Sequence, residues 1–268
     1  TRELAIQIEQ ECRVFAKGSG LSGVLLIGGV PIGPQLRNLR SNPEVIIGTP
    51  GRIKDHIERG TLALGKVSTI VLDEVDRMLD MGFIIDIRMI LSKLPAERQS
   101  LFFSATISPT IDNLIRTFTH DAQTIMSRTS ETSDNVDQSI MHYYENKDKI
   151  EKLHELLLAE HVGKTLIFSE TKRSVERLSK ELADRGFKSD AMHGDKTQGQ
   201  RQRALNKFKE DHIDVLVATD VAARGIDVDN ITHVVNYDVP QTYDDYTHRI
   251  GRAGRGDKTG YAVTFVTH

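Results

Sequence analysis

Residues 69–76 read TIVLDEVD, and this stretch is the clearest indication of the fold. Its first four residues are apolar or β-branched, and three carboxylates follow, at Asp73, Glu74 and Asp76. That order is typical of a buried parallel strand, because such strands are covered on both faces and carry functional loops at their carboxyl ends. An acid in such a loop can hold a metal ion bound to phosphates, while its neighbour deprotonates a water. The alternative is an ordinary helix start, where the helix dipole favours acidic residues.

Apolar runs of the same kind recur along the whole chain and alternate with amphipathic stretches. The other runs lie at residues 24–29, 45–49, 100–106, 139–145, 165–170, 190–194, 215–219, 234–239 and 262–266. The alternation predicts βαβ units around parallel sheets, in an α/β fold with two halves. Between the halves, residues 127–135 read SRTSETSDN, which is the polar composition of a linker. We therefore expect one domain at 1–128, a linker at 129–136 and a second domain at 137–268.

The composition excludes several classes of protein. Of the 268 residues, 38% are hydrophobic and 27% are charged, and the net charge is −3, which excludes a disordered chain. No apolar run approaches the ~20 residues of a membrane-spanning helix. Cys12 is the only cysteine, which excludes an internal disulfide and a thiolate zinc cluster and suits a reducing compartment. Because the chain starts without a signal sequence, we expect a cytoplasmic protein with no membrane association.

A second polar cluster is predicted at the end of the run 99–106, QSLFFSAT. Ser104 and Thr106 would lie at a strand end next to that of the acidic run, where their hydroxyl groups can hydrogen bond with Asp76. The alternative is that Thr106 or Ser108 only caps the following helix, with a proline in its first turn.

Three stretches of the first half are candidates for binding phosphate groups. TPGR at 49–52 follows a strand and opens a helix, with Thr49 as the cap and Arg52 beside the free amides. TRELA at 1–5 also stands where a helix begins, and Gly28 and Gly29 permit close approach of the backbone. Together the three could follow a strand of phosphates, although each also fits an ordinary cap or turn. Since the chain has no overall basic charge, nucleic acid binding would depend on such local groups.

Two loops of the second half combine carboxylates with arginines. ATDVAARGID at 218–227 follows a strand and has no amphipathic pattern. HRIGRAGR at 248–255 places Arg249, Arg252 and Arg255 three residues apart, among glycines that disfavour a helix interior. Arginines so placed can stabilise the charge that develops on a triphosphate during transfer. The alternative is a solvated basic turn.

Taken together, these motifs resemble the DEAD-box family of ATP-dependent RNA helicases, within helicase superfamily two. Matching segments occur in the family's order from residue 1 to the last strand: TRELA, GG, TPGR, DEVD, SAT, LIFSET, the pair Gln198 and Arg201, ATDVAARGIDV, YDVP and HRIGRAGR. Any single match would be weak, but the ordered set is specific. The resemblance implies two RecA-like parallel-sheet domains in tandem, with RNA across both and ATP between them.

The resemblance also implies roles in ATP hydrolysis. Asp73 would hold Mg²⁺ through water, and Glu74 would activate the attacking water. Asp76 would couple to Ser104 and Thr106 and relay the nucleotide state to the RNA surface. The other nucleotide-binding positions would be the arginine fingers Arg252 and Arg255, the ribose contact Asp227 with Gly225, and the domain-bridging residues His248 and Arg249.

For RNA, the resemblance implies contacts with phosphate and sugar, so sequence preference would be slight and binding would depend on salt. The residues expected to make these contacts are Thr1, Arg2, Gly29, Thr49, Arg52, Thr171, Gln198, Arg201 and Thr219.

The chain departs from the family pattern at three places. Val75 and Ala253 stand where Ala and Thr are usual, and both changes are mild. The phosphate-binding loop G-x-x-x-x-G-K-S/T and the adenine-reading glutamine motif normally precede TRELA, where this chain begins. GKT at 163–165 and GDKT at 256–259 are no substitutes, and both are interpreted as turns. We therefore expect a fragment whose first domain lacks its phosphate-loop portion, binds ATP poorly, does not turn it over and is less stable than the second.

The leading hypothesis is that the parent protein is an ATP-dependent RNA helicase that couples hydrolysis to local duplex unwinding or RNP remodelling. We expect ATP and Mg²⁺ as cofactors, RNA as the partner and a monomer; the sequence names no protein partner. One alternative is that the fragment is a non-hydrolysing RNA-binding module. The other is a DNA-directed helicase of the same superfamily.

Overall fold

The computed structural model describes residues 1–126, 135–159, 161–223, 226–254 and 258–268. The chain forms two compact units, Thr1–Ser127 (unit 1) and Arg128–His268 (unit 2). All strand pairs of the described residues are parallel. Each apolar run predicted from the sequence contains a strand, so the prediction of an α/β fold with parallel sheets is confirmed.

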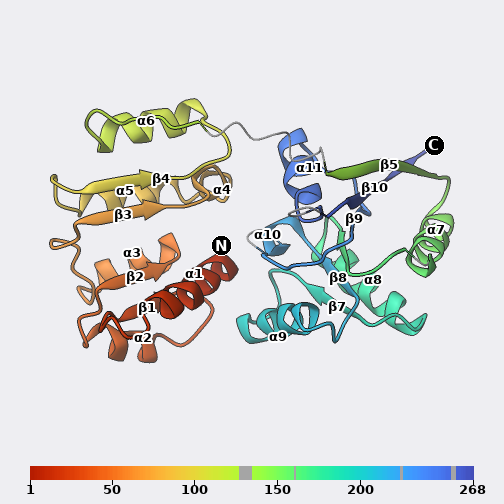
Figure 1. The fold of residues 1–268 in the computed structure, drawn as a ribbon, viewed down its shortest axis with the longest axis horizontal. Coiled ribbons are helices and arrows are strands. Elements are labelled where there is room, and N and C mark those ends of the chain that lie inside the picture. Colours follow the sequence, from red (N-terminus) through yellow and green to blue (C-terminus); the bar gives the residue numbers. More distant parts are fainter. Residues whose placement is uncertain (127–134, 160, 224–225, 255–257) are drawn as a thin grey trace. The chain divides into compact units, whose positions relative to one another are not determined.

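Unit 1 contains two separate pairs of strands, β1 with β2 and β3 with β4 (Figure 1). Its elements follow the order α1 (Arg2–Phe15), β1 (Gly23–Leu26), α2 (Ile32–Leu39), β2 (Val45–Gly48), α3 (Pro50–Glu58), β3 (Thr69–Leu72), α4 (Val75–Asp80), α5 (Ile84–Ser92), β4 (Gln99–Phe102) and α6 (Pro109–Phe118). Capping residues mark the starts of two helices, α1 and α6, which adjoin the predicted TRELA and SAT motifs. Thr1 caps α1, and Ser108, followed by a proline, caps α6.

In unit 1, strands β3 and β4 are covered mainly on one face. Helix α5 and the start of α4 supply Ile87, Leu91 and Val75, which pack with the inner residues of β3 and β4. On the other face, Val71 is 53% exposed and Phe103, just after β4, is 54% exposed. An apolar residue on a parallel strand is usually buried, so this face is unusual.

Unit 2 contains one continuous sheet of six parallel strands. Its elements follow the order β5 (Val136–Tyr143), α7 (Asn146–Leu158), β6 (Thr165–Phe168), α8 (Lys172–Asp184), β7 (Ser189–Met192), α9 (Gln198–Lys209), β8 (Val215–Ala218), α10 (Asp220–Ala223), β9 (His233–Asn236), α11 (Tyr243–Ile250) and β10 (Gly260–Thr267). The strand order is β5-β10-β9-β6-β8-β7. Every residue of β6, β8 and β9 is buried, because two apolar clusters cover the sheet, one on each face.

The expected linker at 129–136 lies mostly outside the described residues. At its end, Asn135 forms a turn and its carbonyl oxygen accepts a hydrogen bond from the Gly260 amide at 2.8 Å. Val136 pairs with Gly260 as the first residue of β5, so this residue belongs to the sheet of unit 2.

In the described part of the chain, no helix is long and apolar enough to cross a lipid bilayer.

Candidate functional site

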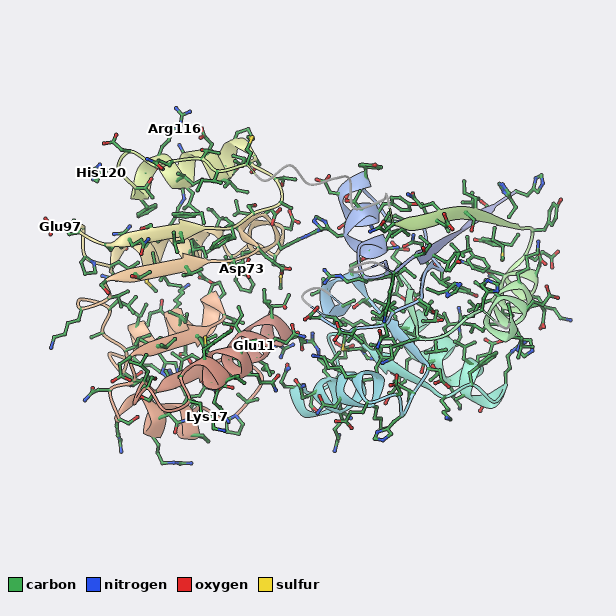
Figure 2. The ribbon with its side chains drawn as sticks, viewed as in Figure 1. Glu11, Lys17, Asp73, Glu97, Arg116 and His120 are labelled. Atoms are coloured by element: carbon green, nitrogen blue, oxygen red, sulfur yellow. The ribbon has the colours of Figure 1, made fainter. Side chains whose placement is uncertain are left out.

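The acidic run DEVD lies where β3 ends and α4 begins. Asp73 directly follows the strand and is exposed, and Figure 2 shows it at the α4 end of β3. Its Oδ1 accepts a hydrogen bond from the Glu74 amide at 2.9 Å. An exposed carboxylate at the carboxyl end of a parallel strand is placed as a ligand-binding group would be.

Glu74 has a strained backbone and an unpartnered carboxylate oxygen. Its φ and ψ are 51° and 50°, in the left-handed region. The other non-glycine residues with positive φ in the described chain are Asn or Asp, which tolerate that region better than Glu. Its Oε2 is buried without a hydrogen-bond partner among the described residues. A strained residue with a free buried acceptor is typical of a functional position, because the strain and the lost hydrogen bond both cost stability.

Asp76 links the acidic run to the SAT motif after β4. Its Oδ2 accepts hydrogen bonds from the backbone amides of Ala105 and Thr106, both at 3.1 Å, and from the Thr106 hydroxyl at 3.3 Å. The Asp76 amide donates to Ser104 Oγ at 3.3 Å, and that hydroxyl donates to the Thr106 carbonyl at 2.7 Å. The structure therefore brings Asp76, Ser104 and Thr106 together. Since Ser108 is the cap of α6, Thr106 is not a helix cap.

The predicted phosphate-binding residues of unit 1 lie around the ends of β1 and β2 and at the start of α1. Thr1 Oγ1 accepts the Leu4 amide at 3.2 Å as the cap of α1, and Arg2 is the first residue of that helix. Gly29 lies in the loop after β1 with φ of 75°. Thr49 is at the N-cap position of α3, but its side chain makes no capping hydrogen bond, which corrects the prediction of an ordinary cap.

Arg52 has partners within unit 1. Both terminal nitrogens of its guanidinium lie 3.4 Å from the Val30 carbonyl, and its Nε lies 3.7 Å from Asp55. Its side chain is 14% exposed, so it is held against the loop after β1.

The predicted RNA-binding residues of unit 2 are unequally accessible. Thr171 caps α8 in a capping box with Ser174 and is exposed, and Thr219 follows β8. Gln198 and Arg201 are only 4% and 3% exposed. Direct contact with RNA by these two side chains would therefore involve few atoms.

Asp238, which follows β9, holds the loop that begins α8. Its carboxylate accepts hydrogen bonds from Ser169 Oγ at 2.6 Å, from the Glu170 amide at 2.8 Å and from Lys149 at 3.0 Å. Burial acts to raise the pKa of Asp238, but these hydrogen bonds outweigh it and hold the pKa below its usual value. Lys149 Nζ also lies 4.0 Å from the centre of the Tyr237 ring.

Arg249 uses its guanidinium inside unit 2. It forms a two-fold ion pair with Asp220, at 2.6 and 2.7 Å, and donates to the Asp238 carbonyl at 2.7 Å. With 4% exposure, Arg249 orders the loops after β8 and β9. The roles of Asp220 and Asp238 as partners were not predicted from the sequence, although both residues stand in the motifs ATDVAARGIDV and YDVP.

The structure describes three of the other residues predicted to bind the nucleotide. Arg252 donates to the Ile226 carbonyl at 2.9 Å, and Asp227 is exposed. The Nδ1 atom of His248 is buried and has no partner among the described residues. The predicted positions Gly225 and Arg255 lie outside the described residues.

Two further predictions concern the GKT segment at 163–165 and the binding of Mg²⁺. Lys164 pairs with Asp211 at 2.6 Å, and Thr165 begins β6, so this segment leads into a strand, as predicted. The GDKT segment at 256–259 lies partly outside the described residues. In the chain as described, no three His, Cys, Asp or Glu side chains are grouped so that they could hold a metal ion. The exposed Asp73 carboxylate fits the predicted mode, in which Mg²⁺ is held through water.

Comparison with known proteins places these observations in a family. The model of the DEAD/DEAH box helicase family matches residues 1–114, and that of the helicase conserved C-terminal domain matches residues 148–257. The ATP-dependent RNA helicase CshA of Listeria monocytogenes serovar 1/2a is 47% identical over 267 residues, which are 99% of this chain and 51% of that protein. The chain thus spans about half the length of this curated relative.

Two solved structures support the same assignment. S. cerevisiae Dbp5 bound to RNA and ADP BeF3 is 31% identical, with a TM-score of 0.87 over 100% of this chain and 70% of that chain. A DEAD box protein from the hyperthermophile Methanococcus jannaschii is 40% identical, with a TM-score of 0.53 over 100% of this chain and 72% of that chain. The two matching models, the identities and the ordered motifs agree, and the chain belongs to the DEAD/DEAH box helicase family, with two RecA-like α/β domains in tandem.

Proposed function

We propose that the protein to which this chain belongs is an ATP-dependent RNA helicase that couples ATP hydrolysis to local unwinding of RNA duplexes or remodelling of RNA–protein complexes. The observation that carries the proposal is the strained Glu74, whose buried Oε2 has no partner among the described residues, beside the exposed Asp73. The name of the Listeria relative and the RNA in the yeast structure support RNA as the partner.

In this proposal the acidic run DEVD and the arginines of the HRIGRAGR motif bind and hydrolyse ATP. Bound Mg²⁺ would neutralise phosphate charge, with Asp73 holding it through a water. Glu74 accepts the proton of the attacking water, for which its free oxygen is suited. The arginine fingers are Arg252 and Arg255, and the other nucleotide-binding positions are Gly225, Asp227, His248 and Arg249.

Asp76 couples the hydrolytic residues to RNA binding. Because its carboxylate holds the backbone amides of Ala105 and Thr106, a shift of the acidic run on hydrolysis would move the loop after β4. The RNA backbone is bound by Thr1, Arg2, Gly29, Thr49, Arg52, Thr171, Gln198, Arg201 and Thr219. We infer that the protein acts as a monomer in the cytoplasm; the single cysteine of this chain suits a reducing compartment.

The test is ATP hydrolysis by the full-length protein, with and without single-stranded RNA. We expect RNA to stimulate turnover and Glu74→Gln to lower it by at least about 100-fold, since the amide cannot accept the proton. Glu97→Gln is the matched control, because Glu97 is exposed and lies at the opposite end of the strands of unit 1 (Figure 2).

Three outcomes would contradict the proposal. Equal turnover by Glu74→Gln and Glu97→Gln would remove Glu74 from the reaction. Stimulation by single-stranded DNA as strong as that by RNA would favour a DNA-directed helicase. RNA binding by the full-length protein without any turnover would favour a non-hydrolysing RNA-binding module.

A further inference from the structure

The loop between β1 and α2 is held by side chains from two helices. The Gln35 amide nitrogen donates to the carbonyl of Ile27 at 3.1 Å and to that of Pro31 at 3.5 Å. Both terminal nitrogens of Arg52 donate to the carbonyl of Val30 at 3.4 Å. Three carbonyl oxygens of this loop are therefore turned towards donors of the protein itself.

A chain of hydrogen bonds continues from Gln35 into the interior of unit 1. Gln35 Oε1 lies 3.4 Å from Nε2 of His56, and Nδ1 of His56 lies 2.9 Å from the Thr61 hydroxyl. Gln35 is 5% exposed and His56 is fully buried. These hydrogen bonds connect the end of α3, through Gln35 of α2, with the loop after β1.

The direction of these hydrogen bonds follows from the Gln35 amide. Because its nitrogen faces the Ile27 carbonyl, its oxygen has to face His56, which must then donate from Nε2. Burial, with a contribution from Arg52, lowers the pKa of His56, so the ring is neutral at pH 7. Its Nδ1 then faces the Thr61 hydroxyl as an acceptor, and the same hydroxyl also lies 3.0 Å from the His56 carbonyl. The Gln35 amide and both ring nitrogens of His56 then each face a polar partner inside unit 1, which favours a rigid buried network.

This arrangement matters for a loop that binds phosphate. A phosphate is attracted by amide hydrogens and repelled by carbonyl oxygens, so the carbonyl groups of such a loop need internal donors. Gly29, at φ of 75°, allows the backbone to reverse between Ile27 and Val30. Without the donors from Gln35, the Ile27 carbonyl would lack its side-chain partner and be free to turn outward.

We propose that Gln35 and His56 are positioning residues for RNA: they hold the loop that contains Gly28 and Gly29 in the form that accepts the RNA phosphate backbone. This inference rests on the proposed function. Neither side chain touches RNA in this scheme, and both act through the loop.

The test is RNA-stimulated ATP hydrolysis by the full-length protein, measured against RNA concentration. Gln35→Met keeps the length of the side chain but removes its donors, and we expect the KM for RNA to rise about tenfold with kcat at saturating RNA within about twofold. His56→Leu should raise that KM about threefold, and His56→Gln, which can still donate to Gln35, should restore it. The double variant Gln35→Met/His56→Leu should resemble Gln35→Met alone, because both changes break one chain.

The matched control is Leu64→Ala, which truncates the apolar core under β1 and β2 without touching the hydrogen bonds. It should lower Tm but leave the KM for RNA unchanged. If Leu64→Ala raised that KM as Gln35→Met does, the effect would be one of stability, and the inference would be wrong. An unchanged KM in Gln35→Met or His56→Leu, with normal stimulation of the wild-type protein, would also overturn it. Absence of stimulation in the wild-type protein would instead overturn the proposed function and this inference with it.

Discussion

The two units follow one βαβ plan but cover their strands differently. In unit 2 every residue of β6, β8 and β9 is buried between two apolar clusters. In unit 1, Val71 on β3 and its register partner Leu101 on β4 are 53% and 36% exposed. Parallel sheets are stable when both faces are covered. Unit 2 therefore covers both faces of its own sheet, whereas one face of β3 and β4 is left uncovered by the described residues.

The largest expected difference between the two units is in their stability when each is prepared separately. We expect residues 128–268 to unfold in one cooperative transition in urea. We expect residues 1–127 to unfold at a lower urea concentration and over a broader range, because the exposed face of β3 and β4 gains little free energy from burial. The same exposed apolar face should bind a dye that fluoresces on apolar surfaces. Circular dichroism and dye fluorescence would measure both. If unit 1 unfolded as sharply as unit 2, at an equal or higher urea concentration, the exposed face of β3 and β4 would not weaken unit 1.

Two truncations test the same difference within the whole chain. Phe208 is fully buried in unit 2, and Phe208→Ala should lower the free energy of unfolding by about 3–5 kcal/mol. Val71 is half exposed in unit 1, and Val71→Ala should cost less than about 1 kcal/mol. Urea unfolding of the wild-type chain and of each variant would measure the two changes in the free energy of unfolding. A loss of several kcal/mol from Val71→Ala would show that this face is covered in solution.

Much of this contrast could not be predicted from the sequence. The strands could be predicted, because runs such as TIVL and VLVA have the same apolar, β-branched character in both units. Their exposure depends on which elements pack over them, and periodicity does not encode that. Val71 and Val217 look equivalent in sequence, yet one is 53% exposed and the other fully buried.

The candidate site was predictable where function demands unusual residues and not where ordinary residues support them. The contact of Asp76 with Ser104 and Thr106 was expected from two adjacent strand ends, and the structure contains it. The buried positions of His56 and Lys149 were missed. A lysine on an amphipathic helix is normally placed on the solvent side, and Lys149 is buried only because Asp238, far along the chain, meets it.

The last predicted effect concerns a buried histidine of unit 2 and appears only at acidic pH. His233 lies at the start of β9, with its ring stacked on Tyr261 and Nδ1 2.9 Å from the Thr232 hydroxyl. Burial, with a contribution from His161, lowers the pKa of His233 from 6.5 to about 4. The unfolded chain therefore binds a proton below about pH 6.5 that the folded unit does not bind until about pH 4.

It follows that unit 2 loses stability as the pH falls from 6.5 towards 4, by about 2–3 kcal/mol at most, and that this loss is absent above pH 6.5. His233→Asn, which keeps a polar atom near Thr232 but does not titrate, should remove that part of the loss. His142→Asn, on the exposed part of β5, should leave it unchanged. Urea unfolding of unit 2 between pH 7 and pH 4 would measure the three proteins. If His233→Asn lost stability with pH as steeply as the wild-type chain, His233 would be free to take up its proton in the folded state, and the core of unit 2 would be more open at this end than its burial indicates.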